Sequence, residues 1–299
     1  MLHEPVMTRE VLAFLRPEKG GIFVDCTVGM GGHALALLEA GASKVIGLDR
    51  DPAALRIAAA TLGKYGERIE LVHSDYRAIA SVLEARGIDR VDGALTDMGM
   101  SSYQLEAEGR GFSFQRNDPL DMRMDTTTGE TAADLLRTAD EPEIADAIYT
   151  FGEERFSRRI ARAIVQARDA APVETTAQLA ALVRRAVPRH GFSRIDPATR
   201  TFQALRIWVN RELENVDEFL RALAQRLKTG ARLVVITFHS LEDRIVKHTL
   251  RALAPREGAS LRILTKKPVT PQSDELARNH RARSAKLRAA ECIVERAFP

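Results

Sequence analysis

The chain of 299 residues predicts an α/β fold in which a largely parallel sheet is interrupted by an inserted helical domain. Three observations predict it. Short apolar runs alternate with segments of helical period as far as Asp97, strand-like runs then cease, and a β-branched run at residues 232–238 resumes the sheet. We therefore assign residues 1–106 and 208–299 to one domain and residues 107–207 to the insert.

The first elements form a β-α-β unit. The apolar run at residues 21–25 predicts a strand, the glycines at 29–32 a turn, and the following segment, closed by Gly41, a helix. The run KVIGLD at residues 44–49 predicts the next strand. Asp51 followed by proline then favours the start of a second helix.

The later elements continue this alternation until the insert. A strand is expected at residues 70–73, a helix at 79–86, and a strand from Val91 to Leu95 that ends at Asp97. After Asp97, helices are expected at residues 132–136, 156–167 and 209–227. Strands are expected at residues 232–238, 261–265 and 292–298.

Composition narrows the class of protein. Hydrophobic residues at 45% and charged residues at 28% are typical of a globular chain, and no apolar run reaches the roughly 20 residues of a membrane span. The first residues lack the apolar stretch of a signal peptide, so we expect a cytoplasmic protein without membrane contact. Cys26 and Cys292 are expected to be core residues, and the seven histidines show no metal-ligand spacing.

The glycine turn predicts a nucleotide-cofactor site. Ligands of open α/β sheets bind beyond the carboxyl ends of the strands, where glycines allow close approach to the backbone. Asp49 ends the second strand and suits hydrogen bonds from the two ribose hydroxyls of an adenosine. The string from Gly29 to Ala34 also fits the GxGxxA dinucleotide pattern, so the loop itself leaves S-adenosylmethionine (SAM), NAD and a purely structural turn open.

Longer strings carry a resemblance to a known family. They are DCTVGMGGH from Asp25, DMGMSSYQLE from Asp97, RGFSF and PLDMRMD between Arg110 and Asp125, GEERFSRRIARAI from Gly152, PATRTFQALRIWVN from Pro197, FHSLEDRIVK from Phe238 and NHRARSAKLR from Asn279. In this order, over nearly the whole chain, they closely resemble the bacterial ribosomal RNA small subunit methyltransferase H family, formerly MraW.

The resemblance implies a class I SAM-dependent methyltransferase (Rossmann-like) sheet with an inserted helical domain. It implies transfer of a methyl group from SAM to the exocyclic 4-amino group of a cytidine in 16S ribosomal RNA, with the small ribosomal subunit as partner. The cofactor contacts that it implies fall on Gly31, Gly32, His33, Asp49, Tyr76, Asp97 and Gln104. Tyr103 stands where the family has proline and is expected to loosen the backbone ahead of Gln104.

The chemistry of amine methylation gives candidate roles to residues near the ends of the strands. A cytidine amine is a weak nucleophile, so it must be aligned with the methyl donor and must lose a proton. Asp97 is the predicted proton acceptor, with Ser101, Ser102 and His239 as further candidates for holding the base. For His239 a hydrogen bond within a turn is an alternative, and Ser240, followed by two acids, is expected to be a helix N-cap. His33 at a helix start is expected to contact SAM chiefly through its backbone N–H.

RNA binding predicts local basic surface, although the net charge is only +3. Residues 244–288 hold 12 Lys or Arg against three acids, and residues 153–211 hold 12 Arg against five. The predicted RNA contacts are Arg278, Arg281, Arg283, Lys286 and Arg288.

Trp208 is expected to be a core residue rather than a stacking platform. The sequence leaves open whether the chain forms a homodimer.

Overall fold

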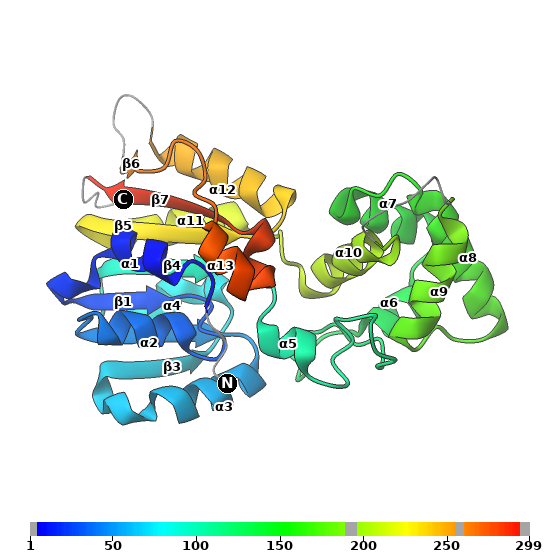
Figure 1. Cartoon of the computed structure of the whole chain (residues 1–299), viewed down its shortest axis with the longest axis horizontal. Helices are drawn as coiled ribbons and strands as arrows, with labels where there is room; N and C mark the ends of the chain where they lie inside the picture. The colour runs from blue at the N-terminus through cyan, green and yellow to red at the C-terminus, as the bar shows by residue number, and fades with distance from the viewer. Residues whose placement is uncertain (1–4, 189–195, 255–259, 294–299) are drawn as a thin grey trace. The chain divides into compact units, whose positions relative to one another are not determined.

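The structure is a computed structural model that describes residues 5–188, 196–254 and 260–293. The chain divides into two compact units, one of Met1–Gly99 with Asn215–Pro299 and one of Met100–Glu214 (Figure 1). The predicted insert, residues 107–207, falls within the second unit. No helix within the described ranges is long and apolar enough to cross a membrane.

The first unit is built on a seven-stranded sheet of order β3-β2-β1-β4-β5-β7-β6. Its strands are β1 (Ile22–Asp25), β2 (Lys44–Asp49), β3 (Ile69–His73), β4 (Val91–Asp97), β5 (Leu227–Thr237), β6 (Leu261–Ile263) and β7 (Lys286–Cys292). The first five are parallel, and β7 pairs antiparallel with both β5 and β6. This order and direction confirm the predicted class I methyltransferase fold. The strand order reverses beside β1, where ligands of such sheets bind.

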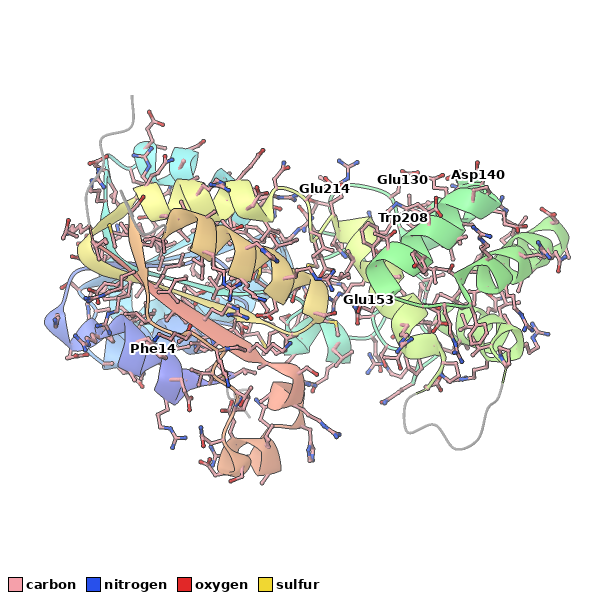
Figure 2. All side chains as sticks on the ribbon, turned by 90° about the horizontal axis from the view of Figure 1, so that it is seen from above. Phe14, Glu130, Asp140, Glu153, Trp208 and Glu214 are labelled. Carbon is pink, nitrogen blue, oxygen red and sulfur yellow. The ribbon has the colours of Figure 1, made fainter. Side chains whose placement is uncertain are left out.

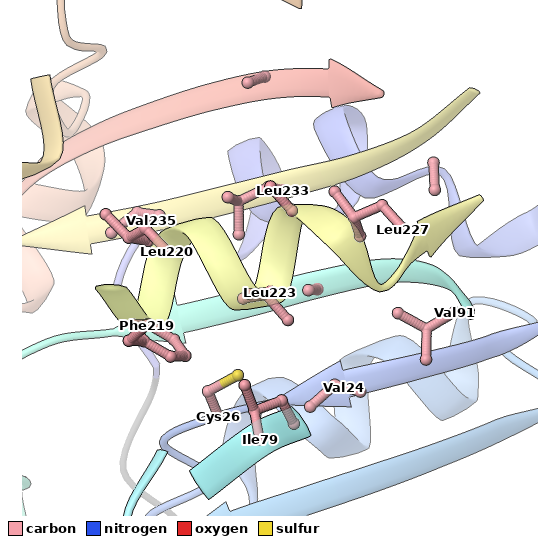
Figure 3. Packing of buried hydrophobic residues seen from close by; sticks show 14 of the residues in the cluster. Val24, Cys26, Ile79, Val91, Phe219, Leu220, Leu223, Leu227, Leu233 and Val235 are labelled. Carbon is pink, nitrogen blue, oxygen red and sulfur yellow. The ribbon is translucent and has the colours of Figure 1, made fainter. Parts of the chain in front are cut away.

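Helices cover both faces of this sheet, so its strands are buried on both sides (Figure 1). They are α1 (Thr8–Leu15), α2 (Gly32–Glu39), α3 (Pro52–Leu62), α4 (Ile79–Glu84), α11 (Val216–Gln225), α12 (Ser240–Leu253) and α13 (Ser273–Arg278). Successive residues of β1 point to opposite faces: Val24 joins the cluster with Phe219 and Leu223, whereas Phe23 joins the cluster on the other side (Figure 3). Cys26 and Cys292 are core residues, as predicted.

The second unit is helical. Its helices are α5 (Ser102–Glu106), α6 (Ala132–Thr138), α7 (Glu141–Gly152), α8 (Ser157–Ala170), α9 (Thr176–Ala186) and α10 (Ala198–Asn210). They enclose a separate hydrophobic core that includes Ile148, Ile164 and Phe202. Trp208 packs against this core as predicted (Figure 2).

The predicted helix at residues 209–227 is wrong. The chain forms two helices instead, α10 ending at Asn210 and α11 beginning at Val216. Arg211 and Asn215 take left-handed backbone angles, φ 49° and 55°, which interrupt the helical hydrogen bonds between them. The apolar pattern runs on through this break because both helices bury one face, so periodicity alone did not reveal it.

The last predicted strand, residues 292–298, lies mostly outside the described residues, and the sequence missed the strand that precedes it. The strand β7 spans Lys286–Cys292, and residues 294–298 lie outside the described part of the chain. Leu287, Ala289 and Ala290 are buried against the neighbouring strands. The basic residues of β7 made this strand resemble a continuation of the basic loop that precedes it.

Candidate active site

The loop between β1 and α2 is tied to the strands on both sides. The backbone N–H of Cys26 donates to the Leu95 carbonyl of β4 (2.8 Å), and that of Val28 donates to the Leu48 carbonyl of β2 (2.7 Å). The Thr27 hydroxyl accepts a hydrogen bond from the backbone N–H of Asp97 at 2.6 Å. The loop and the end of β4 are therefore held as one piece of structure at the carboxyl edge of the sheet.

The glycines of the loop sit where side chains would not fit. Gly31 has φ 92°, and a Cβ there would lie 2.9 Å from a methyl group of Leu62. A Cβ on Gly32 would lie 3.1 Å from the ring of Pro5. Gly29 also has a left-handed backbone, φ 52°. The loop thus requires glycine for its conformation and brings backbone N–H groups close to the start of α2.

Asp49 is fixed at the end of β2 by two backbone donors. Its Oδ2 accepts from the Gly29 N–H and its Oδ1 from the Asp51 N–H, both at 2.8 Å. Burial raises the pKa of Asp49 to about 6, although the hydrogen bonds from Asp51 and Gly29 act to lower it. A carboxylate offers about four acceptor positions, so each oxygen can take one more hydrogen bond. Two ribose hydroxyls fit this requirement.

Asp25, at the end of β1, is a buried acid whose ionisation the sequence did not reveal. It is fully buried; its Oδ1 accepts from the Thr27 N–H at 3.2 Å, and its Oδ2 has no hydrogen-bond partner among the described residues. Burial raises its pKa to about 7, against the lowering effect of His33. Its place at a strand end beside the glycine turn was the available signal.

His33 and Asp97 come together at the same edge. The His33 Nε2 lies 3.6 Å from the Asp97 Oδ2, with the two side chains 5% and 23% exposed. Burial lowers the pKa of His33, but Asp97, Asp25 and Glu275 raise it, and the net result is a pKa above the ordinary value. The family resemblance predicted both residues at the site, with His33 expected to contact SAM chiefly through its backbone N–H.

Tyr76 follows β3 in the short 3-10 helix Tyr76–Ala78. Its ring packs on Phe219, with centroids 4.5 Å apart, and it is partly buried. Asp75 caps this turn and pairs with Arg77 at 2.7 Å. Tyr76 is therefore not simply a surface residue, and its contact with a cofactor stays a prediction.

Ser101, Ser102 and Gln104 belong to the second unit, at the start of α5. The Gln104 backbone N–H donates to the Ser101 hydroxyl (3.2 Å), and the Ser101 N–H donates to the Gln104 side-chain oxygen (2.8 Å). This capping box closes the turn, so the expected loosening by Tyr103 is wrong. The roles of Ser101, Ser102 and Gln104 toward cofactor and base stay predictions.

The N-cap of α12 is His239, which corrects the expectation for Ser240. His239 has an extended backbone, and its Nδ1 accepts from the Glu242 N–H at 3.5 Å, while Ser240 is the first helical residue. Glu242 is buried, accepts from the Phe238 N–H at 3.0 Å and lies 3.0 Å from the His239 Nε2. This local pairing matches the turn alternative for His239, and its catalytic role stays untested.

The predicted RNA contacts differ in exposure. Arg278 and Arg283 are exposed, Lys286 is partly exposed, and Arg281 is partly buried. Arg288 is different: its side chain is 9% exposed and donates to Asp243 at 2.7 Å. Arg288 thus holds β7 to α12, and its charge is neutralised within the protein rather than offered to RNA.

Comparison with known proteins settles the family. The profile described as the MraW methylase family matches residues 1–293. The chain belongs to the MraW methylase family. Relatives named ribosomal RNA small subunit methyltransferase H include one from Geotalea uraniireducens, 48% identical over 97% of this chain and 98% of the relative. Others, from Thermotoga neapolitana and a Cyanothece species, are 49% and 52% identical, covering 98% and 97% of this chain and 97% and 94% of theirs.

Solved structures are more distant from this MraW family member. An rRNA methylase from Streptococcus thermophilus is 12% identical with a TM-score of 0.44, over 98% of this chain and 99% of that one. A SAM-dependent O-methyltransferase from Thermotoga maritima is 11% identical with a TM-score of 0.41, over 99% and 69%. These similarities are too low to identify a function.

Proposed function

We propose that this MraW family methylase transfers a methyl group from SAM to the exocyclic 4-amino group of a cytidine in small-subunit ribosomal RNA. The observation that carries the proposal is the match of about half of all residues, over nearly the full length, to relatives named ribosomal RNA small subunit methyltransferase H. The carboxyl edge of the sheet, with its glycine loop and Asp49, supplies a fitting cofactor site. The substrate places the protein in the cytoplasm with the ribosome.

The residues at the edge fit SAM. Gly31 and Gly32 allow the tight turn that presents backbone N–H groups at the start of α2, and Asp49 keeps acceptor positions for the ribose hydroxyls. Tyr76 and Gln104 are the further proposed contacts. When bound, SAM supplies an electrophilic methyl group, which bonds to the cytidine nitrogen as its bond to sulfur breaks and leaves the electron pair on sulfur.

Asp97 would accept the proton that the methylated nitrogen must lose. Its side chain is 23% exposed at the end of β4, so the carboxylate is accessible to a substrate group. Thr27 fixes the backbone of Asp97 to the cofactor loop, which keeps the acceptor in a constant position relative to the donor site. Alignment of this kind, rather than activation of a strong base, is what a weakly nucleophilic amine requires.

The second unit carries a basic helix face suited to RNA phosphates. Arg158, Arg159 and Arg162 recur at helical spacing in the first turns of α8, Arg155 lies just before the helix, and all four are exposed. The first turn of α8 holds no acid, and within the described residues Arg162 is the one of these four that pairs with a carboxylate, Glu141 at 3.5 Å. Exposed arginines without acidic neighbours favour contact with a polyanion. We assign this unit, from the predicted insert, to substrate recognition.

The C-terminal residues Arg278, Arg281, Arg283 and Lys286 are the proposed RNA contacts of the first unit. Arg283 offers the clearest charge, because it is exposed and pairs with no acid within the described residues. Arg278 lies 3.5 Å from Asp274 but remains 55% exposed. Surface pairs of this kind hold little energy, so an RNA phosphate can compete for the arginine.

Mass spectrometry of small-subunit ribosomal RNA tests the proposal. Cells that lack the protein should lack one 4-amino methyl group on a cytidine, and the unaltered gene should restore it. A gene encoding Asp97→Asn should not restore it. An unchanged set of RNA modifications in the deletion strain would contradict the proposal.

A further inference from the structure

A buried group of ionisable side chains surrounds the start of α2. His33 lies on the first turn of this helix, Asp25 ends β1, Asp97 ends β4, and Glu275 lies on α13. His33, Asp25 and Glu275 are each at most 7% exposed. Glu275 is held in place because it accepts a hydrogen bond from the Met7 backbone N–H at 2.7 Å.

The imidazole of His33 is not satisfied by the protein around it. Neither ring nitrogen has a hydrogen-bond partner among the described residues, and the same is true of the Asp97 Oδ1 and the Asp25 Oδ2. Buried polar atoms without partners cost stability and need an explanation in function. The 3.6 Å separation of the His33 Nε2 and the Asp97 Oδ2 is an ion-pair distance just beyond a hydrogen bond. Catalytic hydrogen bonds often tighten only when ligands bind.

The charges around His33 favour its protonated form. Three carboxyl groups face it from β1, β4 and α13, and Asp49 on β2 adds a fourth acid that acts on Asp25. These groups raise the pKa of His33 in spite of its burial. A positive imidazolium can donate to Asp97 and hold that carboxylate ionised and oriented.

We propose that the His33 side chain is a positioning residue for methyl transfer, acting through the carboxylate of Asp97. This inference rests on the proposed function, in which Asp97 accepts the amine proton. His33 donates from Nε2 to the Oδ2 of Asp97 and so fixes the orientation of the carboxylate that accepts the amine proton. In this proposal the glycines beside His33 contact the cofactor, whereas the imidazole of His33 orients the proton acceptor, Asp97.

Titration of the imidazole by ¹⁵N NMR tests the pair in the protein without SAM or RNA. His33 should titrate above the ordinary histidine value, and its pKa should fall in Asp97→Asn because an opposing charge is lost. His248, exposed on α12 and outside this group of side chains, is the control for effects of the substitution elsewhere. Equal values for His33 in both proteins would overturn the pairing, whatever the enzyme methylates.

Single-turnover kinetics test the consequence for the reaction. In the unaltered enzyme the rate should fall as pH rises through the pKa of His33. His33→Gln should lose this alkaline fall and react about tenfold more slowly at lower pH, because the acceptor is less well oriented. His248→Gln should keep the normal profile. The SAM affinity of His33→Gln should differ from that of the unaltered enzyme by less than about threefold, because the cofactor contacts are kept.

Two results would contradict the positioning role. One is an unchanged rate and pH profile in His33→Gln. The other is a loss of SAM affinity as large as the loss of rate, which would place His33 in cofactor binding. If His33→Gln does not fold, the NMR comparison with Asp97→Asn still decides the pairing. Methylation by the unaltered enzyme is the separate test of the proposed function.

Discussion

The carboxyl edge of the sheet and the exposed face of α8 differ in how far their ionisable side chains are exposed to solvent. At the edge, Asp25 and Asp49 are buried and fixed by backbone donors, and burial raises the pKa of both. On α8, Arg158 and Arg159 are exposed to solvent. Buried charges act strongly and specifically, whereas exposed charges act weakly and in sum. The comparison is consistent with the proposed donor site in one unit and the proposed salt-sensitive RNA surface in the other.

The largest expected effect belongs to the edge. Asp97→Asn should slow single-turnover methylation by about 10²–10⁴-fold, because the amide cannot accept the proton. SAM should still bind, since Thr27 accepts from the backbone of residue 97 and not from its side chain. Asp89→Asn, an 81% exposed acid, is the matched control and should react normally. A normal rate in Asp97→Asn would remove the acceptor role.

The second effect concerns the donor site itself. Asp49→Asn should weaken SAM binding by about 10–100-fold, since hydrogen bonds to a charged acceptor are worth roughly 1.5–3 kcal/mol. Affinity in the unaltered protein should also decrease as pH falls below about 6, where Asp49 becomes protonated. Isothermal calorimetry across pH measures both. SAM affinity that is independent of Asp49 would show that the ribose is held elsewhere.

The third effect is on stability. The folded-state pKa of Asp25, about 7, is above its unfolded value, so the folded protein binds a proton more tightly. The contribution to stability is therefore full below the unfolded pKa near 4 and is lost as pH rises toward 7. Between pH 6 and 8 the free energy of unfolding should fall by about 1 kcal/mol from this group. Asp25→Asn should flatten that slope, and an unchanged slope in urea unfolding would contradict the buried titration.

The smallest effect belongs to α8. Arg158→Ala with Arg159→Ala should weaken RNA binding several-fold and reduce the slope of log affinity against log salt by about two, one for each lost phosphate contact. SAM affinity should not change. Arg137→Ala is the control, because Arg137 on α6 already pairs with Asp134 at 2.7 Å. An unaltered salt slope in the double variant would show that α8 does not face RNA.

The sequence was informative about backbone elements whose local signals are strong. The strand that ends at Asp49, the helix that begins after Asp51 and the glycine turn were all predicted from local patterns. It failed where tertiary contacts override the pattern. The apolar period ran on across the break between α10 and α11, and basic residues concealed β7. Neither feature has a local signal, because each depends on which face the chain buries.

Prediction of the candidate site from the sequence was limited in the same way, by contacts between residues that are distant in the sequence. Glycines and strand-end acids identified the location, since their chemistry follows from their position beside a turn. The pairing of His33 with Asp97, and that of Arg288 with Asp243, depend on side chains distant in the sequence. A row of basic residues therefore predicted charge correctly but not which member the fold neutralises.

The most direct test of the account is methyl transfer from isotopically labelled SAM to purified small ribosomal subunits that lack the modification. The account predicts one labelled methyl group per subunit, located on the 4-amino group of a cytidine, with transfer by Asp97→Asn slower by at least about a hundredfold. Label on another atom, or no label with SAM bound to the folded protein, would contradict it.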